Sequence, residues 1–322
     1  MAADIVPTGQ QQGLEASGQD YDGVIQHFLS GLQPNTLRTY EQGLSDFVSF
    51  LGRREHRQVT RQEAANLLLG HGPANIMAHD YLCDMQGRGL SASSINNRLS
   101  ALRKLVAVAR VRGLIPWSLE VRNVASEPYR DTRGPGTKAV ELLLSQVGGG
   151  TPREVRDRAI IRLLHDLGLR RGEVVALDVA DVELDRRAIH VRRKGKTQTK
   201  LLDLPPQTVR VLKDWLAVRG DDPGPLFTNF DRACKGRRLT GTSVYRNLTR
   251  LGDRAGVHVT PHGIRHTAIS TASVEVAHAG YRQRDLAQYS GHRNSATLDV
   301  YIDAPENLQG QIAEMVASTV KG

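Results

Sequence analysis

The stretch Thr260-Pro261-His262-Gly263-Ile264-Arg265-His266 predicts both the start of a helix and an anion-binding site at that start. Thr260 suits the N-cap position and Pro261 the first helical position. His262 and Arg265 are three residues apart, so they lie on one face near the positive end of the helix dipole. Because the backbone N–H groups and the dipole both favour negative charge there, this helix end is suited to bind a phosphate.

The same stretch also has the spacing of a zinc site, since His262 and His266 are four residues apart. The glutamate that follows the first histidine in zinc-dependent proteases is absent, and Gly263 stands there. The two cysteines, Cys83 and Cys234, are too few and too far apart for a thiolate metal site or a disulfide framework. We therefore expect neither a metal ion nor another cofactor.

Three other stretches carry polar residues that could act on a phosphate. Gly168 to Glu173 ends a predicted helix with an arginine pair. Lys194 lies in a turn, and Tyr301 follows the run Ser290 to Arg293. Each has an ordinary structural explanation: a charge beside helix carbonyls, a solvated turn lysine and a core tyrosine. Taken singly, the structural explanation of each stretch is the stronger one.

The sequence around these stretches predicts a mostly helical domain with a small sheet. Helices are expected from Lys138 and from the cap Thr151-Pro152. The runs Ala188 to Arg192 and Lys200 to Leu204 flank a lysine-rich turn at residues 194–197, which predicts a β-hairpin. After the hairpin the pattern is that of helices to the end of the chain.

The first part of the chain predicts a helical bundle. Residues 1–20 show no apolar periodicity and are expected to be disordered, whereas residues 21–123 contain four amphipathic segments. Residues 124–137, rich in Gly, Pro and Arg, are expected to link this bundle to a second domain at 138–322. The four segments begin at Asn35-Thr36, at a capping box formed by Thr60 and Glu63, at Pro73, and at Ser91 or Ser93.

Length and composition agree with two domains. A chain of 322 residues usually exceeds what one hydrophobic core serves. A formal charge of +9 favours a polyanionic partner, with nucleic acid the leading candidate. No run of about 18 apolar residues and no signal-peptide pattern is found, so we expect a cytoplasmic protein that does not enter a membrane. The expected fold class is mainly α with a small β-sheet: a helical N-terminal bundle plus a mixed α/β, mostly helical, second domain.

Together the polar residues resemble the catalytic set of the tyrosine recombinase (phage integrase) family, which has arginine, lysine, histidine-x-x-arginine, glycine-histidine and tyrosine in this order. The spacings resemble those of simple bacterial members: 24 residues from arginine to lysine, three within the histidine–arginine pair and nine from the last histidine to the tyrosine. The resemblance covers the chain from about Tyr21 onward, and Leu90 to Leu105 is similar to the last helix of the family's core-binding domain. The matching residues are Arg170, Lys194, His262, Arg265, His292 and Tyr301.

The resemblance selects Arg170 rather than Arg171, because Glu173 follows three residues later, as in the family's first box. Glu173 is expected to support that arginine. The choice of lysine stays open, since Lys196 and Lys200 share the hairpin of the matched lysine.

The resemblance implies covalent chemistry on DNA. In such a reaction Tyr301 attacks the phosphorus. His262, which matches the family's proton acceptor, takes the proton of Tyr301, and Lys194 acts as general acid on the departing 5′ oxygen. The product is a 3′-phosphotyrosine bond and a free 5′-hydroxyl. Because that bond keeps the phosphodiester energy, rejoining needs neither ATP nor a metal.

The remaining matched residues stabilise charge on the phosphate. Arg170 and Arg265 can clamp its non-bridging oxygens with forked N–H donors, and His292 is expected to donate one further hydrogen bond. Gly263 and Ile264 replace the commoner side chains of the family's second box, and neither change removes a functional group.

The resemblance also implies partners. These are double-stranded DNA target sites and further copies of the chain: a monomer off DNA and a homotetramer on paired sites, which integrates, excises or resolves DNA. Ser93, Asn97 and Arg98 are the candidates for groove contacts from the bundle. A terminal helix is expected to dock on a neighbouring protomer, with packing on its own protomer as the alternative. Its apolar positions are Leu308, Ile312, Met315 and Val316.

Two other functions fit parts of this pattern. A type IB topoisomerase uses similar chemistry to relax supercoils, but the helical first domain and the terminal helix favour pairing of two sites. A DNA-binding module with a vestigial site is the second alternative. Candidates at every expected catalytic position argue against it.

Overall fold

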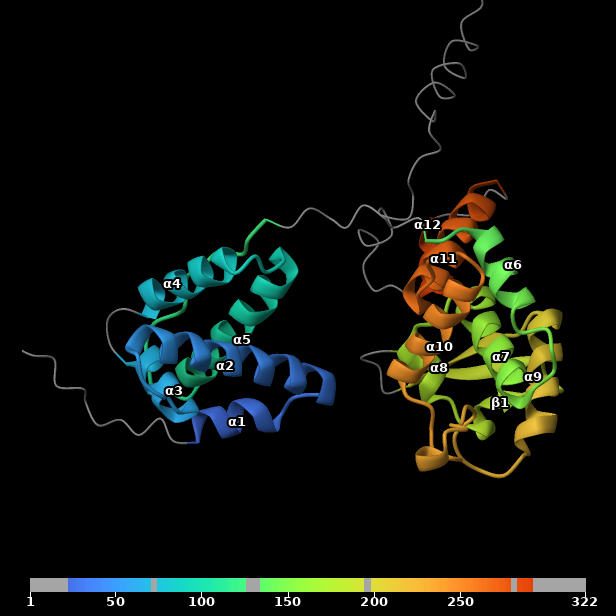
Figure 1. Cartoon of the computed structure of the whole chain (residues 1–322), viewed down its shortest axis with the longest axis horizontal. Helices are drawn as coiled ribbons and strands as arrows, with labels where there is room; N and C mark the ends of the chain where they lie inside the picture. The colour runs from blue at the N-terminus through green and yellow to red at the C-terminus, as the bar shows by residue number, and fades with distance from the viewer. Residues whose placement is uncertain (1–22, 71–73, 126–133, 194–197, 279–282, 292–322) are drawn as a thin grey trace, which may run out of the picture. The chain divides into compact units, whose positions relative to one another are not determined.

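The computed structural model describes residues 23–70, 74–125, 134–193, 198–278 and 283–291. Lys194, His292, Tyr301 and the predicted terminal helix lie outside these residues. The chain divides into two compact units, Met1–Pro128 and Tyr129–Gly322. Each unit has its own helices (Figure 1) and its own hydrophobic core.

The first unit is the helical bundle that the sequence predicts. Gly43 sets the approach of α2 to α5, because a Cβ atom there would lie only 3.1 Å from the Cβ of Ala101. Thr60 and Glu63 form the predicted capping box, and Ser91 caps α5 by accepting a hydrogen bond from the Ser94 N–H. The predicted segments omitted α1, which is two turns long. The helices are α1 (Val24–Ser30), α2 (Pro34–Glu55), α3 (Arg61–Leu69), α4 (Ala74–Gly87) and α5 (Ala92–Val111).

Three aromatic rings fill the centre of this bundle. Tyr81 lies 5.2 Å from the rings of both Phe47 and Phe50, measured between centroids, and all three side chains are buried. The Tyr81 hydroxyl donates a 2.7 Å hydrogen bond to Asp46. Because Arg88 also donates to Asp46 at 2.7 Å, the carboxylate that receives the buried phenol is itself paired.

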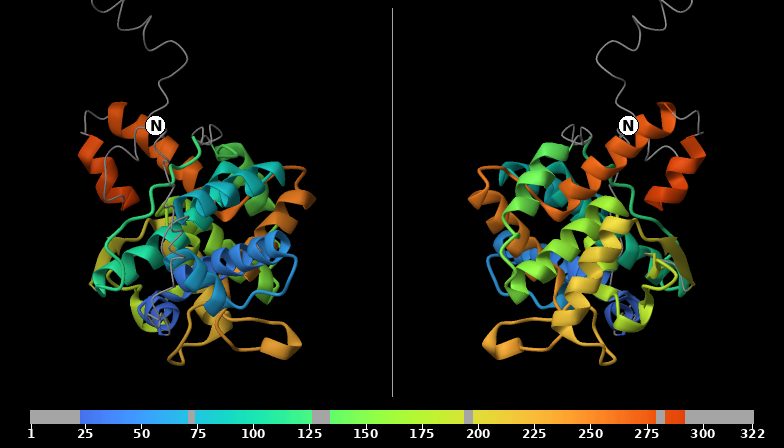
Figure 2. Two further views of the ribbon diagram at one scale, coloured as in Figure 1. Left: turned by 90° about the vertical axis from the view of Figure 1, so that its left-hand side faces the viewer. Right: turned by 90° about the vertical axis from the view of Figure 1, so that its right-hand side faces the viewer.

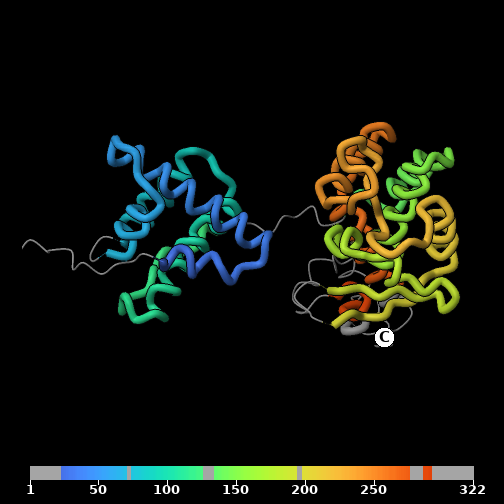
Figure 3. The backbone as a smooth tube through the Cα atoms, turned by 90° about the horizontal axis from the view of Figure 1, so that it is seen from below, coloured from blue at the N-terminus to red at the C-terminus, as the bar shows by residue number. Residues whose placement is uncertain are grey.

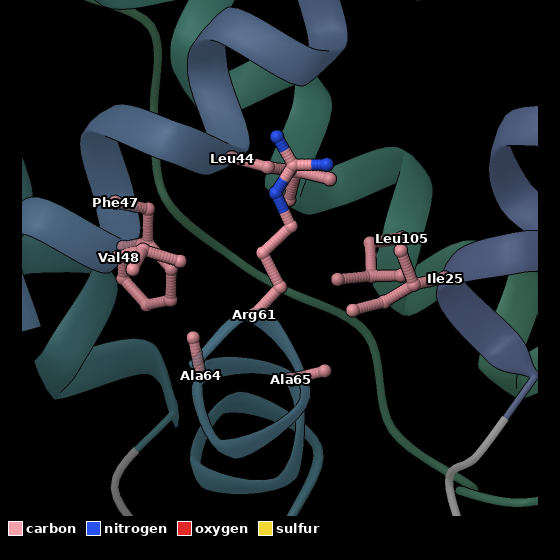
Figure 4. A pocket seen from close by; sticks show the side chains of 8 residues that line it. All are labelled: Ile25, Leu44, Phe47, Val48, Arg61, Ala64, Ala65 and Leu105. Carbon is pink, nitrogen blue, oxygen red and sulfur yellow. The ribbon is translucent and has the colours of Figure 1, made fainter. Parts of the chain in front are cut away.

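A small pocket lies between α1, α2, α3 and α5 (Figure 4). Its volume of about 10 Å³ is room for at most one water molecule. The side chain of Arg61 extends between Leu44 and Leu105, and its guanidinium donates to the hydroxyl of Ser45 at 3.2 Å. The pocket is therefore a gap covered by an arginine stem and is too small to bind a ligand.

The second unit is mostly helical with a three-stranded antiparallel sheet in the order β1-β2-β3. Its two longer strands form the predicted hairpin, with Val191 opposite Lys200 and Arg192 opposite Thr199, and they run side by side in Figure 3. The elements are α6 (Thr137–Ser145), α7 (Pro152–Asp166), α8 (Arg171–Ala176), a 3-10 turn η1 (Val179–Asp181), β1 (Val182–Glu183), β2 (Ala188–Arg192), β3 (Thr199–Asp203), α9 (Pro206–Arg219), a second 3-10 turn η2 (Arg232–Cys234), α10 (Gly241–Arg254), α11 (Pro261–His278) and α12 (Gln283–Ser290).

Helix α7 is the centre of this unit and packs against both α9 and α11. Its start is fixed by Thr151, which caps it and forms a capping box with Glu154. The largest buried side chain, Trp215 of α9, donates its indole N–H to the Leu226 carbonyl at 2.8 Å. The segment between α9 and α10 extends away from the helices (Figure 2). The packed helices α7 and α11 carry part of the candidate site.

Candidate active site

The start of α11 follows the sequence prediction. Thr260 caps the helix by accepting a 3.0 Å hydrogen bond from the Gly263 N–H, and Pro261 is the first helical residue. Ile264 turns into the core with no exposed surface. Arg265, only 1% exposed, is therefore held against the interior, whereas His262 is open to solvent on one side.

Arg265 joins α11 to two other predicted stretches. One terminal nitrogen of its guanidinium donates to the carbonyl of Gly168, at the end of α7. The other donates to the carbonyl of Ser290, the last residue of α12, at 2.6 Å. A guanidinium has five N–H donors in one plane, so the two carbonyls fix the orientation of that plane. Stretches 97 and 25 residues away in sequence thus meet at one arginine.

Arg170 and Glu173 form a pair beside this arginine. The buried carboxylate of Glu173 accepts the Arg170 backbone N–H at 2.8 Å and the Arg170 guanidinium at 3.0 Å. The neighbouring Arg171 is exposed, so Arg170 is the arginine with a fixed position at this helix start. Its charge, like that of Arg265, acts on the imidazole of His262.

The two histidines of α11 contact each other. The Nε2 atoms of His262 and His266 are 2.7 Å apart, so one ring donates its N–H to the other. Burial, followed by the charges of His266, Arg265 and Arg170, lowers the pKa of His262 from 6.5 to about 4. His262 is therefore neutral at pH 7, which is the state in which an imidazole accepts a proton.

We expect His262 of the DNA-free protein to stay neutral through the range in which histidines usually titrate. In an NMR titration its ring resonance, assigned with a His262→Asn variant, should show no midpoint between about pH 5 and 8. A midpoint near 6.5 would contradict the lowered pKa. A bound phosphate brings negative charge and raises the value, so the titration must be done without DNA.

The end of α12 is built to a tight geometry. Gly291, which follows the helix, has φ of 65°, in the left-handed region that favours glycine. A Cβ atom there would lie 2.8 Å from the guanidinium carbon of Arg193. His292, the next residue, lies outside the described residues. Gly291 is therefore needed both for the turn and for the approach of Arg193.

Tyr289 is a second tyrosine close to the site, and its environment argues against a role as nucleophile. Its hydroxyl donates to the carbonyls of His165 at 3.0 Å and Asp166 at 3.3 Å. Burial and then the Asp166 charge raise its pKa to about 12. Its ring lies 3.2 Å from where a Cβ atom of Gly168 would be, so Gly168 allows this packing.

Two hairpin residues contact the same helix end, and the sequence does not predict these contacts. Arg193, 5% exposed, donates to the carbonyl of Tyr289 at 3.1 Å and to that of Ser290 at 3.4 Å. Lys200 donates to the carbonyl of Gln288 at 2.9 Å. Lys200, which is also an alternative for the catalytic lysine, thus contacts the end of α12. The only sequence signal for either is its place in the hairpin, because their partners are about 90 residues away in sequence.

Gly263, a departure from the family's pattern, has a packing reason. A Cβ atom on Gly263 would lie 3.2 Å from the Cδ of Pro135, and one on Gly134 would lie 2.5 Å from the Gly263 carbonyl. The Gly136 N–H also donates to the hydroxyl of Thr267 at 3.1 Å. Residues 134–136, at the end of the predicted linker, thus pack on α11.

The candidate groove contacts of the first unit differ in their surroundings. Ser93 and Asn97 are exposed on α5. Arg98 instead turns toward its own bundle, with its side chain 17% exposed and its Nε 3.4 Å from Asp46. Arg103, another basic residue of α5, donates to the Val121 carbonyl at 3.1 Å. Arg98 and Arg103 therefore stabilise the bundle.

Two further observations concern only the parts of the chain that the structure describes. Among those residues there is no group of three or more His, Cys, Asp or Glu side chains that could hold a metal ion. No helix in these parts is long and apolar enough to span a bilayer.

Both units match known protein families. Residues 137–307 match the phage integrase family, and residues 25–113 match the N-terminal SAM-like domain of phage integrases. The chain is 33% identical to a protein named tyrosine recombinase from Synechocystis sp., over 94% of this chain and 98% of that protein. It is 27% identical to tyrosine recombinase XerC of Vibrio cholerae serotype O1, over 85% of this chain and 84% of that protein.

Solved structures show the same fold. XerH recombinase, in a post-cleavage complex with its difH substrate, superimposes with a TM-score of 0.67 at 19% identity, covering 87% of this chain and 80% of XerH. A lambda integrase dimer bound to a core site gives 0.63 at 14% identity, covering 87% of this chain and 76% of the integrase. With both units matched by family models and a relative above 30% identity over nearly its whole length, this chain belongs to the phage integrase family of tyrosine recombinases.

Proposed function

We propose that this protein is a site-specific recombinase that breaks and rejoins double-stranded DNA through a 3′-phosphotyrosyl bond on Tyr301. The observation that carries the proposal is that the stretches leading to Arg170 and His292 both contact the side chain of Arg265. That one buried guanidinium contacts the end of α7, two residues before Arg170, and the end of α12, two residues before His292. The pairing of Arg170 with Glu173 and the neutral His262 complete the described part of the site.

The described residues suit the first half of the reaction. The hydroxyl of Tyr301, with an ordinary pKa of about 10, is mostly protonated at pH 7, so its attack on phosphorus needs a proton acceptor. His262 is neutral and can take that proton. As the pentacoordinate phosphorus forms, charge grows on the non-bridging oxygens, and Arg170 and Arg265 stabilise it.

The second half concerns the leaving group. The 5′ oxygen departs as an alkoxide unless it is protonated, and Lys194 is the general acid proposed for this step. His292 donates to a non-bridging oxygen. The bond between Tyr301 and the 3′ phosphate keeps the energy of the broken phosphodiester, so reversal by a 5′-hydroxyl rejoins the strand without ATP.

The partner proposed is double-stranded DNA, met in the cytoplasm. Two solved relatives are described as bound to DNA, XerH to difH and lambda integrase to a core site. The formal charge of +9 suits a phosphate backbone. The assembly proposed is a monomer off DNA and a homotetramer on two paired sites, with the segment bearing Leu308 and Ile312 docking on the neighbouring protomer.

The deciding experiment separates recombination from supercoil relaxation. DNA ends captured on the protein are sequenced to give the target site, and two copies are placed in one supercoiled plasmid. In buffer with EDTA, wild-type protein should delete or invert the segment between the copies. Relaxation without exchange would favour a topoisomerase, and binding without any covalent adduct would favour an inactive DNA-binding module.

A further inference from the structure

Basic side chains from the hairpin and from α11 gather at the carboxyl end of α12. The last carbonyls of a helix have no partner within it, and the helix dipole places negative charge there. In the described residues Lys200 donates to the carbonyl of Gln288 and Arg193 donates to that of Tyr289. Both Arg193 and Arg265 donate to the carbonyl of Ser290. The end of α12 is thus fixed by four long-range hydrogen bonds from three side chains, in addition to its own backbone bonds.

Arg193 is the most buried contact between the hairpin and this helix end. Its side chain is 6% exposed, and its Nη1 lies 3.5 Å from the carboxylate of Glu173, which is itself paired with Arg170. A buried cation is costly unless it is paired, so the Glu173 charge and the two carbonyls determine where this guanidinium lies. Arg193 therefore connects the hairpin, the Arg170–Glu173 pair and α12.

Arg193 and Lys200 also stand on the two sides of the hairpin loop. Arg193 directly follows β2 and directly precedes Lys194, while Lys200 belongs to β3. Both strand ends that flank the loop are thus tied to α12. Lys194 and His292 are each joined by one peptide bond to one of these described residues, Lys194 to Arg193 and His292 to Gly291.

We propose that Arg193 is a positioning residue for strand cleavage: its guanidinium ties the strand end that leads to Lys194 to the helix end that leads to His292. This inference rests on the proposed function. It assigns Arg193 no contact with DNA. Its effect is on the rate of the chemical step in the bound complex, through the general acid next to it.

The chain offers a matched control. Arg158 of α7 donates to the carbonyl of Val147 at 3.0 and 2.5 Å, just beyond the end of α6. It therefore fixes a helix end as Arg193 does, but it contacts none of the site residues described above. Arg193→Met and Arg158→Met both remove a guanidinium that binds backbone carbonyls, and they should cost comparable thermal stability. A rate effect confined to Arg193→Met cannot then come from stability alone.

The assay is single-turnover cleavage of a nicked duplex that carries the captured target site, at DNA concentrations that saturate each variant and well below every melting temperature. Two versions of the duplex are used, one with the ordinary 5′ bridging oxygen and one with sulfur in its place. A thiol, with a pKa of about 8.5, departs without a proton far more readily than an alcohol. The sulfur duplex therefore does not need the general acid. Lys194→Ala is included as a reference for loss of that acid.

With oxygen, Arg193→Met should cleave about 100-fold more slowly than wild type, the lower end of what a general acid contributes, while Arg158→Met stays within about threefold. With sulfur, the deficit of Arg193→Met should fall by at least about tenfold, as that of Lys194→Ala should. Arg193→Lys keeps the charge and one donor group, so it should cleave at an intermediate rate. Dissociation constants for the duplex should stay within about twofold.

Two results would overturn the positioning role. One is an oxygen-duplex rate for Arg193→Met equal to that of Arg158→Met, and the other is an equal deficit on the oxygen and sulfur duplexes. Failure of the proposed function looks different, because wild-type protein would then form no covalent adduct with either duplex.

Discussion

Tyr301→Phe is expected to abolish strand cleavage and to leave DNA binding within about twofold of wild type. The substitution removes one oxygen and little volume, so contacts with the phosphate backbone persist. The covalent route has no substitute nucleophile, and the cleavage rate on a nicked duplex should fall by at least about 10⁴-fold. Gel-resolved adducts and binding isotherms measured on the same preparation check both parts.

Tyr289→Phe is the matched control for this loss. It removes the hydroxyl that donates to the His165 and Asp166 carbonyls, at a cost of about 1 kcal/mol in stability, and should still form the adduct. An adduct formed by Tyr301→Phe but lost in Tyr289→Phe would mean that the nucleophile is the buried tyrosine. That result would contradict the account.

Arg265→Lys is expected to have the next largest effect, a fall in cleavage rate of about 10²-fold to 10³-fold. An ammonium keeps the charge but cannot contact the Gly168 and Ser290 carbonyls and a phosphate in one plane. The loss should be in the rate at saturating DNA rather than in affinity. Single-turnover rates and binding isotherms separate the two.

Arg158→Lys provides the comparison, since it also shortens an arginine that binds a backbone carbonyl. It should lose stability without losing cleavage. If both lysine variants cleave at the wild-type rate, Arg265 is a structural arginine and the phosphate clamp must be sought elsewhere.

Local signals in the sequence predicted much of the fold. The capping residues Thr60, Thr151 and Thr260 mark helix starts that the structure has, because an N-cap is decided by residues within one turn. The hairpin was predicted for the same reason, from two short runs around a turn. Helix α1 and the six-residue α8 were not predicted, since one or two turns carry too little periodicity to be recognised.

Candidate site residues can be predicted only where residue type and order carry information. Arg170, His262 and Arg265 are candidates because of their order, and the structure brings the stretches that carry them together. The contacts of Arg193 and Lys200 with α12 were not predicted, because they are made with backbone carbonyls, which any sequence supplies. Arg98, a candidate for DNA contact from its place on α5, pairs with Asp46, and no short-range pattern indicates that pairing.

The proposed function requires that the matched residues surround one scissile phosphate, which Tyr301 attacks. The most direct measurement is to trap the covalent complex on a nicked duplex, digest it and map the nucleotide-bearing peptide by mass spectrometry. The account predicts one modified residue, Tyr301, joined to a 3′ phosphate, with a 5′-hydroxyl on the released strand. A nucleotide on any other residue, or a link to a 5′ phosphate, would contradict it.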